Sequence, residues 1–156
     1  MADQIRYNRA GASNAGAADE DKLVTGQKII LYGGAGLVGQ NLIPRLLARG
    51  HANIVVFDKH RANLAILREM QPGITAEYAD LSRPGAWQAL AAGADVAVML
   101  QAQIGGIDYR EFVANNVETT RLILEAVKAS ANCYLVHVSS SVVVSVATDS
   151  AGGALS

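Results

Sequence analysis

Glycine recurs at every third position in one short stretch, at Gly33, Gly36 and Gly39, between an apolar run at 28–32 and a helical pattern. Gly33 allows a tight turn, and Gly36 allows the backbone to approach a pyrophosphate group without a Cβ atom in the way. Gly39 would let the following helix pack against the sheet. A glycine-rich loop without a ligand is the alternative, but the position between a strand and a helix favours a site for the diphosphate of a dinucleotide.

The start of that helix supplies the second part of the expected phosphate site. Leu37 and Val38 lie between the second and third glycines, in the first turn of the helix. The free N–H groups of a first turn and the positive end of the helix dipole both favour a bound anion. We therefore count Leu37 and Val38 with the three glycines as candidates for cofactor binding.

A carboxylate follows the second apolar run of the chain. Asp58 ends the run at 52–58, about twenty residues beyond the glycines, where an acidic side chain can accept hydrogen bonds from an adenosine ribose. Its charge would repel a 2′-phosphate and favour NAD, whereas the adjacent Lys59 and the nearby Arg61 would favour NADP. The alternative for Asp58 is a helix cap for the segment 61–70.

The third and fourth apolar runs also end in candidate ligand contacts. Asp80 and Leu81 follow the run at 74–79, where the carboxylate and backbone either hydrogen-bond an adenine or cap the next turn. The run at 95–100 ends at Leu100, followed by Gln101 and Ala102, and these three candidates fall at the carboxyl end of the fourth expected strand, where ligands of parallel sheets bind.

Asn115 and Asn116 lie inside the helical pattern at 112–128, although asparagine is a mediocre helix former. An amide at such a position needs a partner. It either bonds a neighbouring backbone group, which is a structural role, or holds a water molecule at an active site. We include Asn116 among the cofactor-binding candidates.

The elements that must position these residues follow from the pattern of the chain. Five apolar runs of strand length, the last at 134–138, alternate with segments of helical periodicity. This alternation predicts an α/β fold with a doubly wound parallel sheet and right-handed crossovers. Ligands of such sheets bind at the carboxyl ends of the strands, and the glycines, both aspartates, Gln101 and a run of three serines at 139–141 all fall there. The alternative for the serines is a polar loop that closes the fifth strand.

Length and composition exclude several classes of protein. The 156 residues fit one domain, which we expect at 27–156, preceded by a disordered tail at 1–26 that is rich in Ala, Gly, Asn and Asp. The net charge of −1 predicts no nucleic-acid partner and no membrane surface. No apolar run approaches the ~20 residues of a membrane span. The single cysteine, Cys133, fits a reducing, cytoplasmic location, and no metal site is expected.

Taken together, these motifs resemble the extended short-chain dehydrogenase/reductase family, the NAD-dependent epimerases and dehydratases of sugar nucleotides. The run Gly-Gly-Ala-Gly-Leu-Val-Gly at 33–39 is similar to the family's GxxGxxG loop. Asp58 resembles the ribose-binding acid, and Asp80 with Leu81 resembles the pair that contacts adenine. The strand with its end at 95–102 is similar to the one that flanks the cofactor.

Two further motifs carry the resemblance toward the catalytic side. Asn-Val-Glu-Thr-Thr at 116–120 looks like the family's Asn-Val-x-Gly-Thr motif, with Thr119 in place of glycine. Val-His-Val-Ser-Ser at 136–140 resembles the strand that delivers the catalytic serine or threonine. The resemblance implies a Rossmann-like cofactor domain, NAD as cofactor with NADP as the alternative, and a nucleotide sugar or similar small-molecule substrate. It assigns the catalytic serine to Ser140, with Ser141 as the neighbouring candidate.

The chain departs from the family pattern in its catalytic pair. The tyrosines are at positions 7, 32, 78, 109 and 134, and none has a lysine four residues later, so the family's Tyr-x-x-x-Lys is absent. A tyrosine with its pKa lowered by a nearby lysine is the family's acid/base. We therefore expect the chain to bind a dinucleotide weakly and to have no turnover alone.

Two hypotheses remain for the chain as a whole. The first is the cofactor-binding part of an NAD(P)-dependent oxidoreductase, epimerase or dehydratase, with the sheet truncated after about five strands, as a fragment or a naturally truncated product. The second is a non-catalytic dinucleotide-binding or partner-binding module. An open flank beside the fifth strand predicts either self-association, as in a homo-oligomer, or poor solubility.

Overall fold

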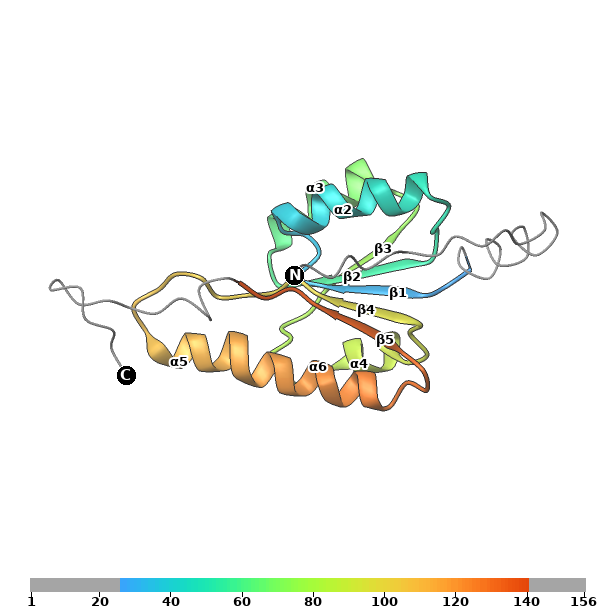
Figure 1. Ribbon diagram of the computed structural model, residues 1–156. Helices are drawn as coiled ribbons and strands as arrows, with labels where there is room; N and C mark the ends of the chain where they lie inside the picture. Colours follow the sequence, from blue (N-terminus) through green and yellow to red (C-terminus); the bar gives the residue numbers. More distant parts are fainter. Residues whose placement is uncertain (1–25, 141–156) are drawn as a thin grey trace, which may run out of the picture.

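The computed structural model describes residues 26–140, so residues 1–25 of the tail expected at 1–26, and the segment at 141–156, lie outside the described residues. Strands and helices alternate along the described chain (Figure 1). The strands are β1 (Ile29–Tyr32), β2 (Ile54–Asp58), β3 (Thr75–Tyr78), β4 (Val96–Met99) and β5 (Tyr134–His137). The helices are α2 (Leu37–Ala48), α3 (Arg61–Met70), α4 (Ala86–Ala91), α5 (Tyr109–Phe112) and α6 (Thr119–Lys128), with a π-helical segment at Val113–Glu118 between α5 and α6.

The five described strands form one parallel sheet in the order β3-β2-β1-β4-β5. The predicted doubly wound, Rossmann-like α/β fold is therefore confirmed. The order reverses at β1: the chain goes outward through β2 and β3, then crosses back to pair β4 on the other side of β1. This reversal opens a crevice beyond the carboxyl end of β1, the place where ligands of such sheets bind.

Helices cover both faces of the sheet. In Figure 1, α2 and α3 lie above it and α4, α5 and α6 lie below it. Alternate residues of β1 point to the two sides: Ile29 and Leu31 belong to the core under α2 and α3, whereas Ile30 and Tyr32 belong to the core over α4 and α6. Because β1 and β2 are buried on both faces, they appear in the sequence as unbroken apolar runs rather than alternating ones.

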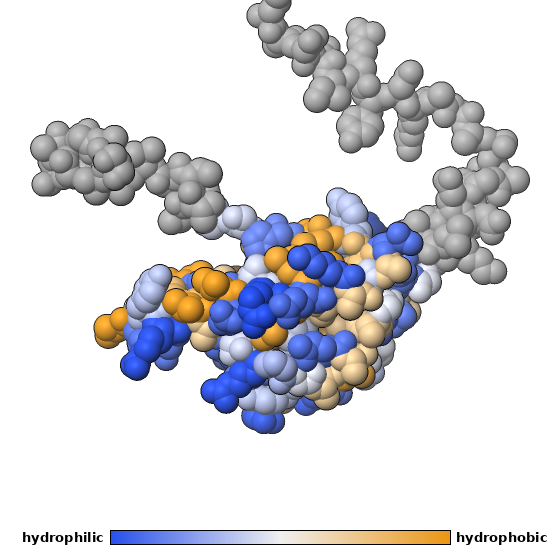
Figure 2. Space-filling model, turned by 90° about the horizontal axis from the view of Figure 1, so that it is seen from below, coloured by the Kyte–Doolittle hydropathy of each residue, from blue (hydrophilic) through white to orange (hydrophobic). Residues whose placement is uncertain are grey.

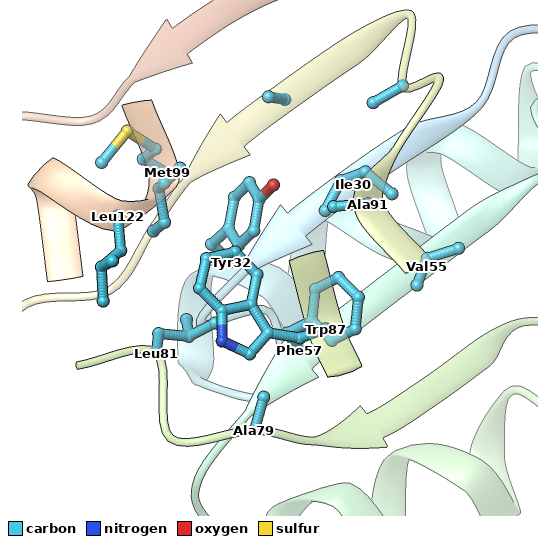
Figure 3. Close-up of a cluster of buried hydrophobic side chains, with 13 residues drawn as sticks. Ile30, Tyr32, Val55, Phe57, Ala79, Leu81, Trp87, Ala91, Met99 and Leu122 are labelled. Atoms are coloured by element: carbon cyan, nitrogen blue, oxygen red, sulfur yellow. The ribbon is translucent and has the colours of Figure 1, made fainter. Parts of the chain in front are cut away.

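An aromatic cluster fills the lower core beneath the crevice (Figure 3). The Tyr32 ring stacks on Phe57, with 5.9 Å between centroids, and meets Trp87 edge-on at the same separation. Trp87 is buried and its indole N–H donates to the carbonyl oxygen of Arg83 over 2.9 Å, so it belongs to the core. Burial raises the pKa of the Tyr32 phenol far above its ordinary value. Tyr32 therefore stays protonated and has a packing role.

The last helical stretch differs from the prediction of a single helix over 112–128. It begins at Tyr109, where Asp108 accepts a hydrogen bond from the backbone N–H of Arg110 over 2.9 Å and caps α5. It then continues through the π segment into α6. The Thr119 hydroxyl donates to the carbonyl of Ala114, five residues back, over 3.1 Å. One wide turn is thus built into the helix beside the crevice.

Hydrophobic surface gathers at one end of the molecule. Figure 2 shows it in orange at the left, over the end where α5 and the loop before it lie. Ile104 and Ile107 of that loop are fully exposed. Within residues 26–140, no helix combines the length and apolar character needed to span a membrane.

Candidate functional site

A cavity of about 250 Å³ lies at the carboxyl ends of β1, β2 and β4. Nine of the predicted cofactor-binding residues line it: Gly33, Gly36, Asp58, Lys59, Asp80, Leu81, Leu100, Gln101 and Ala102. Leu37, Val38, Gly39 and Asn116 are not among the lining residues. Residues from four separate runs of the sequence thus converge on one place, as the parallel topology predicts.

The glycine loop forms a wall of the cavity at which Gly33 and Gly36 carry no side chain. Gly33 has a φ of +78°, and a Cβ there would lie 2.7 Å from the backbone nitrogen of Gln101, so the turn requires glycine. A Cβ on Gly36 would meet only the carbonyl oxygen of Gly33, at 3.4 Å. The space over Gly36 is therefore open, as a backbone that approaches a diphosphate requires.

Gly39 lies against the entry loop of its own helix. Its added Cβ would lie 2.1 Å from the carbonyl oxygen of Gly34 in the preceding turn. Gly39 thus lets α2 pack against this loop, and its expected part in packing the helix against the sheet stays a prediction. Leu37 and Val38, in the first turn of α2, are 80% and 56% exposed. They border the open side of the loop.

Asp58 ties the end of β2 to the glycine loop. Its Oδ2 accepts a hydrogen bond from the backbone N–H of Ala35 over 3.1 Å. Its Oδ1 accepts from the backbone N–H of His60 over 2.9 Å and lies 3.0 Å from the His60 ring nitrogen Nδ1. The N-cap of α3 is His60, so Asp58 is not the helix cap considered as its alternative role. A carboxylate has about four acceptor positions, so one on Oδ2 is left for a ribose hydroxyl.

Asp80 has the turn-capping role considered for it, and it also lines the cavity. Its Oδ1 accepts hydrogen bonds from the hydroxyl and the backbone N–H of Ser82, over 2.6 and 3.1 Å, which closes the turn after β3. The hydroxyl bond is the main cause that holds the pKa of Asp80 below its ordinary value. Asp80 therefore stays ionised at neutral pH while it lines the cavity.

Gln101 lines the same cavity and carries a buried acceptor without a partner in the described part of the chain. Its carboxamide oxygen is buried and has no hydrogen-bond partner among residues 26–140. An unpaired buried oxygen is costly, so a donor from a ligand would relieve that cost. This feature was not predicted from the sequence, because it depends on how the β4 end packs against Gly33.

The two asparagines of the π segment face the loop after β4. Asn116 accepts from the backbone N–H of Gln103 over 2.7 Å and donates to its carbonyl oxygen over 3.1 Å, the structural role considered for it. Asn115 lines the cavity, as do Gln103, Thr119, His60 and Ala79. The sequence analysis missed these five residues, and only the Asn-Asn pair within a helical pattern gave a signal.

The predicted catalytic serine does not line the cavity. Ser140 is exposed and is not among the lining residues, and Ser141 lies outside the described residues. Within the described part of the chain, no three His, Cys, Asp or Glu side chains come together in a group that could hold a metal ion.

Comparisons with known proteins agree with this arrangement. A family model described as the NAD dependent epimerase/dehydratase family matches residues 29–153. No curated protein sequence matches the chain. The chain is similar to the solved structure of the Bordetella bronchiseptica enzyme WbmF in complex with NADH, at 25% identity and a TM-score of 0.64, over 75% of this chain and 36% of that one.

Two further solved structures share the fold at lower identity. Uronate dehydrogenase from Agrobacterium tumefaciens is 22% identical, with a TM-score of 0.62, over 74% of this chain and 41% of that one. Gre2 from Candida albicans, in complex with NADPH, is 20% identical, with a TM-score of 0.64, over 80% of this chain and 39% of that one. The chain thus spans well under half the length of these enzymes.

Proposed function

Because the chain belongs to the NAD-dependent epimerase/dehydratase family, we propose that residues 27–156 form the cofactor-binding part of an NAD(P)-dependent oxidoreductase, epimerase or dehydratase. The observation that carries the proposal is the convergence of three ligand-ready features on one cavity. These are the bare backbone at Gly36, the remaining acceptor of Asp58 and the unpaired oxygen of Gln101.

The chemistry of the cavity fits a dinucleotide from one end to the other. The first turn of α2 offers backbone N–H groups, and Gly36 leaves the approach to them free of a side chain, which suits a diphosphate. Asp58 would accept from the ribose hydroxyls of the adenosine, and Asp80 with Leu81 would contact the adenine. Gln101 and Ala102 would flank the cofactor on the side of β4. The nicotinamide, when bound, supplies hydride transfer.

The positions of the charges favour NAD over NADP. The Asp58 carboxylate would repel a 2′-phosphate, as expected from the sequence. Of the two cations that could offset it, Arg61 has its guanidinium over the Tyr78 ring, 3.7 Å from the centroid, and Lys59 donates from Nζ to Asn115 Oδ1 over 2.8 Å within the cavity. WbmF is solved with NAD+ and Gre2 with NADPH, so relatives of this fold use either cofactor.

The substrate we propose is a nucleotide sugar or a similar compound with a hydroxyl or carbonyl group. One structure of WbmF holds UDP together with NAD+, which supports this class. Ser140 would hydrogen-bond the substrate oxygen, with Ser141 as the neighbouring candidate. Neither serine would remove a proton. The family's proton acceptor is a tyrosine with a lysine four residues later, and no tyrosine of the chain has one. Tyr32 cannot replace the missing base, because it is buried and stays protonated.

The absence of a Tyr-x-x-x-Lys pair from this sequence favours a second candidate function. A chain that binds a dinucleotide without a Tyr-x-x-x-Lys pair would act as a dinucleotide-binding or partner-binding module. The two candidates share the binding step and differ in turnover. We expect the chain alone to bind NADH and to show no oxidoreductase activity.

Titration of the 156-residue chain with NADH, followed by the nicotinamide fluorescence, tests the binding step. Gly36→Asp should abolish binding, because it places a carboxylate against the phosphates where the backbone has room for the side chain. Gly73→Asp is the matched control, since Gly73 lies at an open position remote from the cavity and receives the same charge. Failure of the unaltered, folded chain to bind NADH below millimolar concentration would refute the proposal.

A further inference from the structure

One hydrogen bond crosses the cavity from wall to wall. Lys59, directly after β2, donates from Nζ to Oδ1 of Asn115 in the π segment over 2.8 Å, and 56 positions separate them in the chain. Both residues line the cavity. We propose that this bond, which we call the latch, closes over the adenine end of a bound dinucleotide and slows its release. The inference rests on the proposed function and adds Asn115 to the binding site.

The Asn115 side of the latch is held in place by its own contacts. The Asn115 amide group donates to Oε1 of Gln103 over 3.2 Å. Its neighbour Asn116 holds the backbone of Gln103 through two further bonds, and Thr119 closes the wide turn of the π segment. The amide that receives the lysine is thus oriented before any ligand arrives.

The Lys59 side is built to move. Lys59 is exposed and carries its charge on a four-carbon stem, which can swing away from the cavity and return. Two carboxylates, Asp58 and Asp80, line the same cavity. The charge of Lys59 contributes to the lowered pKa of Asp80, so the ammonium lies close enough to that carboxylate for electrostatic attraction between them. This attraction favours the return of the ammonium to the closed position.

The space beneath the latch suits a group the size of a base. The cavity holds about 250 Å³ while the bond is made, the volume of roughly eight water molecules at about 30 Å³ each. A closed latch and an occupied adenine site are therefore compatible. In the proposed arrangement the base leaves between Lys59 and Asn115, so the bond must open first.

Stopped-flow displacement of NADH from the 156-residue chain tests the latch. Lys59→Met and Asn115→Ala each remove one partner, and each should speed the release of NADH about tenfold, the size expected for one charge-assisted hydrogen bond that is partly exposed to solvent. The double variant should be no faster than the single ones, because both changes break the same bond. Lys128→Met, an exposed lysine at the end of α6, removes the same charge away from the cavity and should leave release unchanged.

The two single variants distinguish the latch from a simple effect of the lysine charge. If Lys59→Met speeds release but Asn115→Ala does not, Lys59 acts by its charge alone and the latch is wrong. Additive effects in the double variant also contradict it. Normal binding by the unaltered chain with unchanged release in both single variants overturns the latch alone. No binding by the unaltered chain overturns the proposed function, and the latch with it.

Discussion

At the scale of single residues, the entry to α2 is the most crowded point of the fold. A Cβ on Gly39 would lie 2.1 Å from the carbonyl oxygen of Gly34 and 2.6 Å from its Cα. Helix propensity alone would favour alanine at this interior position by about 1 kcal/mol. The backbone of the glycine loop cannot move away without disturbing the Ala35 N–H that donates to Asp58. Sterics therefore outweigh propensity here.

Gly39→Ala should accordingly destabilise the protein, by about 2–3 kcal/mol in the free energy of unfolding. Urea denaturation followed by circular dichroism measures this difference. Gly36→Ala is the control, because its Cβ would meet one atom at 3.4 Å, and we expect a change within about 0.5 kcal/mol. A stabilised Gly39→Ala variant would show that the loop and helix are not packed as described.

At the scale of elements, the π segment joins the last helix to the loop after β4. Asn115 and Asn116, consecutive residues of this segment, both form hydrogen bonds with that loop. The pair holds Gln103 by both its backbone and its side chain. The loop that forms one wall of the cavity therefore depends on this segment for its position.

Asn116→Ala should free that loop. The variant loses two hydrogen bonds to the backbone of Gln103 and should cost about 1–3 kcal/mol of stability. Hydrogen exchange at the Gln103 N–H, read by NMR, should become faster. In Asn115→Ala the same N–H keeps its acceptor and should stay protected. Equal protection of Gln103 in the two variants would contradict this role of Asn116.

The elements also show how far the sequence could predict this molecule. Apolar runs and helical periodicity are local signals, so the five strands were found within a residue or two at each end. The gathering of Gly36, Asp58 and Gln101 followed from a general rule for parallel sheets. The bond from Ala35 to Asp58 and the crossing from Lys59 to Asn115 could not be predicted, because they join residues 23 and 56 positions apart. Such contacts depend on register and side-chain packing, which periodicity does not encode.

At the scale of the whole molecule, the described sheet ends in an exposed strand. β5 pairs with β4 on one side, and Tyr134, Val136 and Val138 are exposed there. Among the described strands, none lies beyond β5. An edge with apolar side chains and unpaired backbone groups is a template for pairing with another chain. This is the open flank that the sequence analysis expected.

We predict that the 156-residue chain self-associates through this edge in a concentration-dependent way. Tyr134→Lys should shift it toward the monomer, because a charge on an edge strand opposes pairing and Tyr134 is 70% exposed. Tyr109→Lys makes the same change at a similarly exposed position in α5, away from the edge, and should leave association intact. Light scattering over a range of concentrations reads the outcome, and a monodisperse monomer of the unaltered chain would contradict the prediction.

The central place of β1 affects how the protein is made. β1 precedes the other described strands in the chain, yet it takes neighbours on both sides: Ile29 pairs with Ile54 in β2 and with Val96 in β4. At about 5–20 residues per second, the ribosome delivers the second neighbour a few seconds after the first. For that interval the nascent chain lacks the strand that covers the second side of β1. A chaperone that recognises extended apolar segments would have its best opportunity then, before β4 emerges.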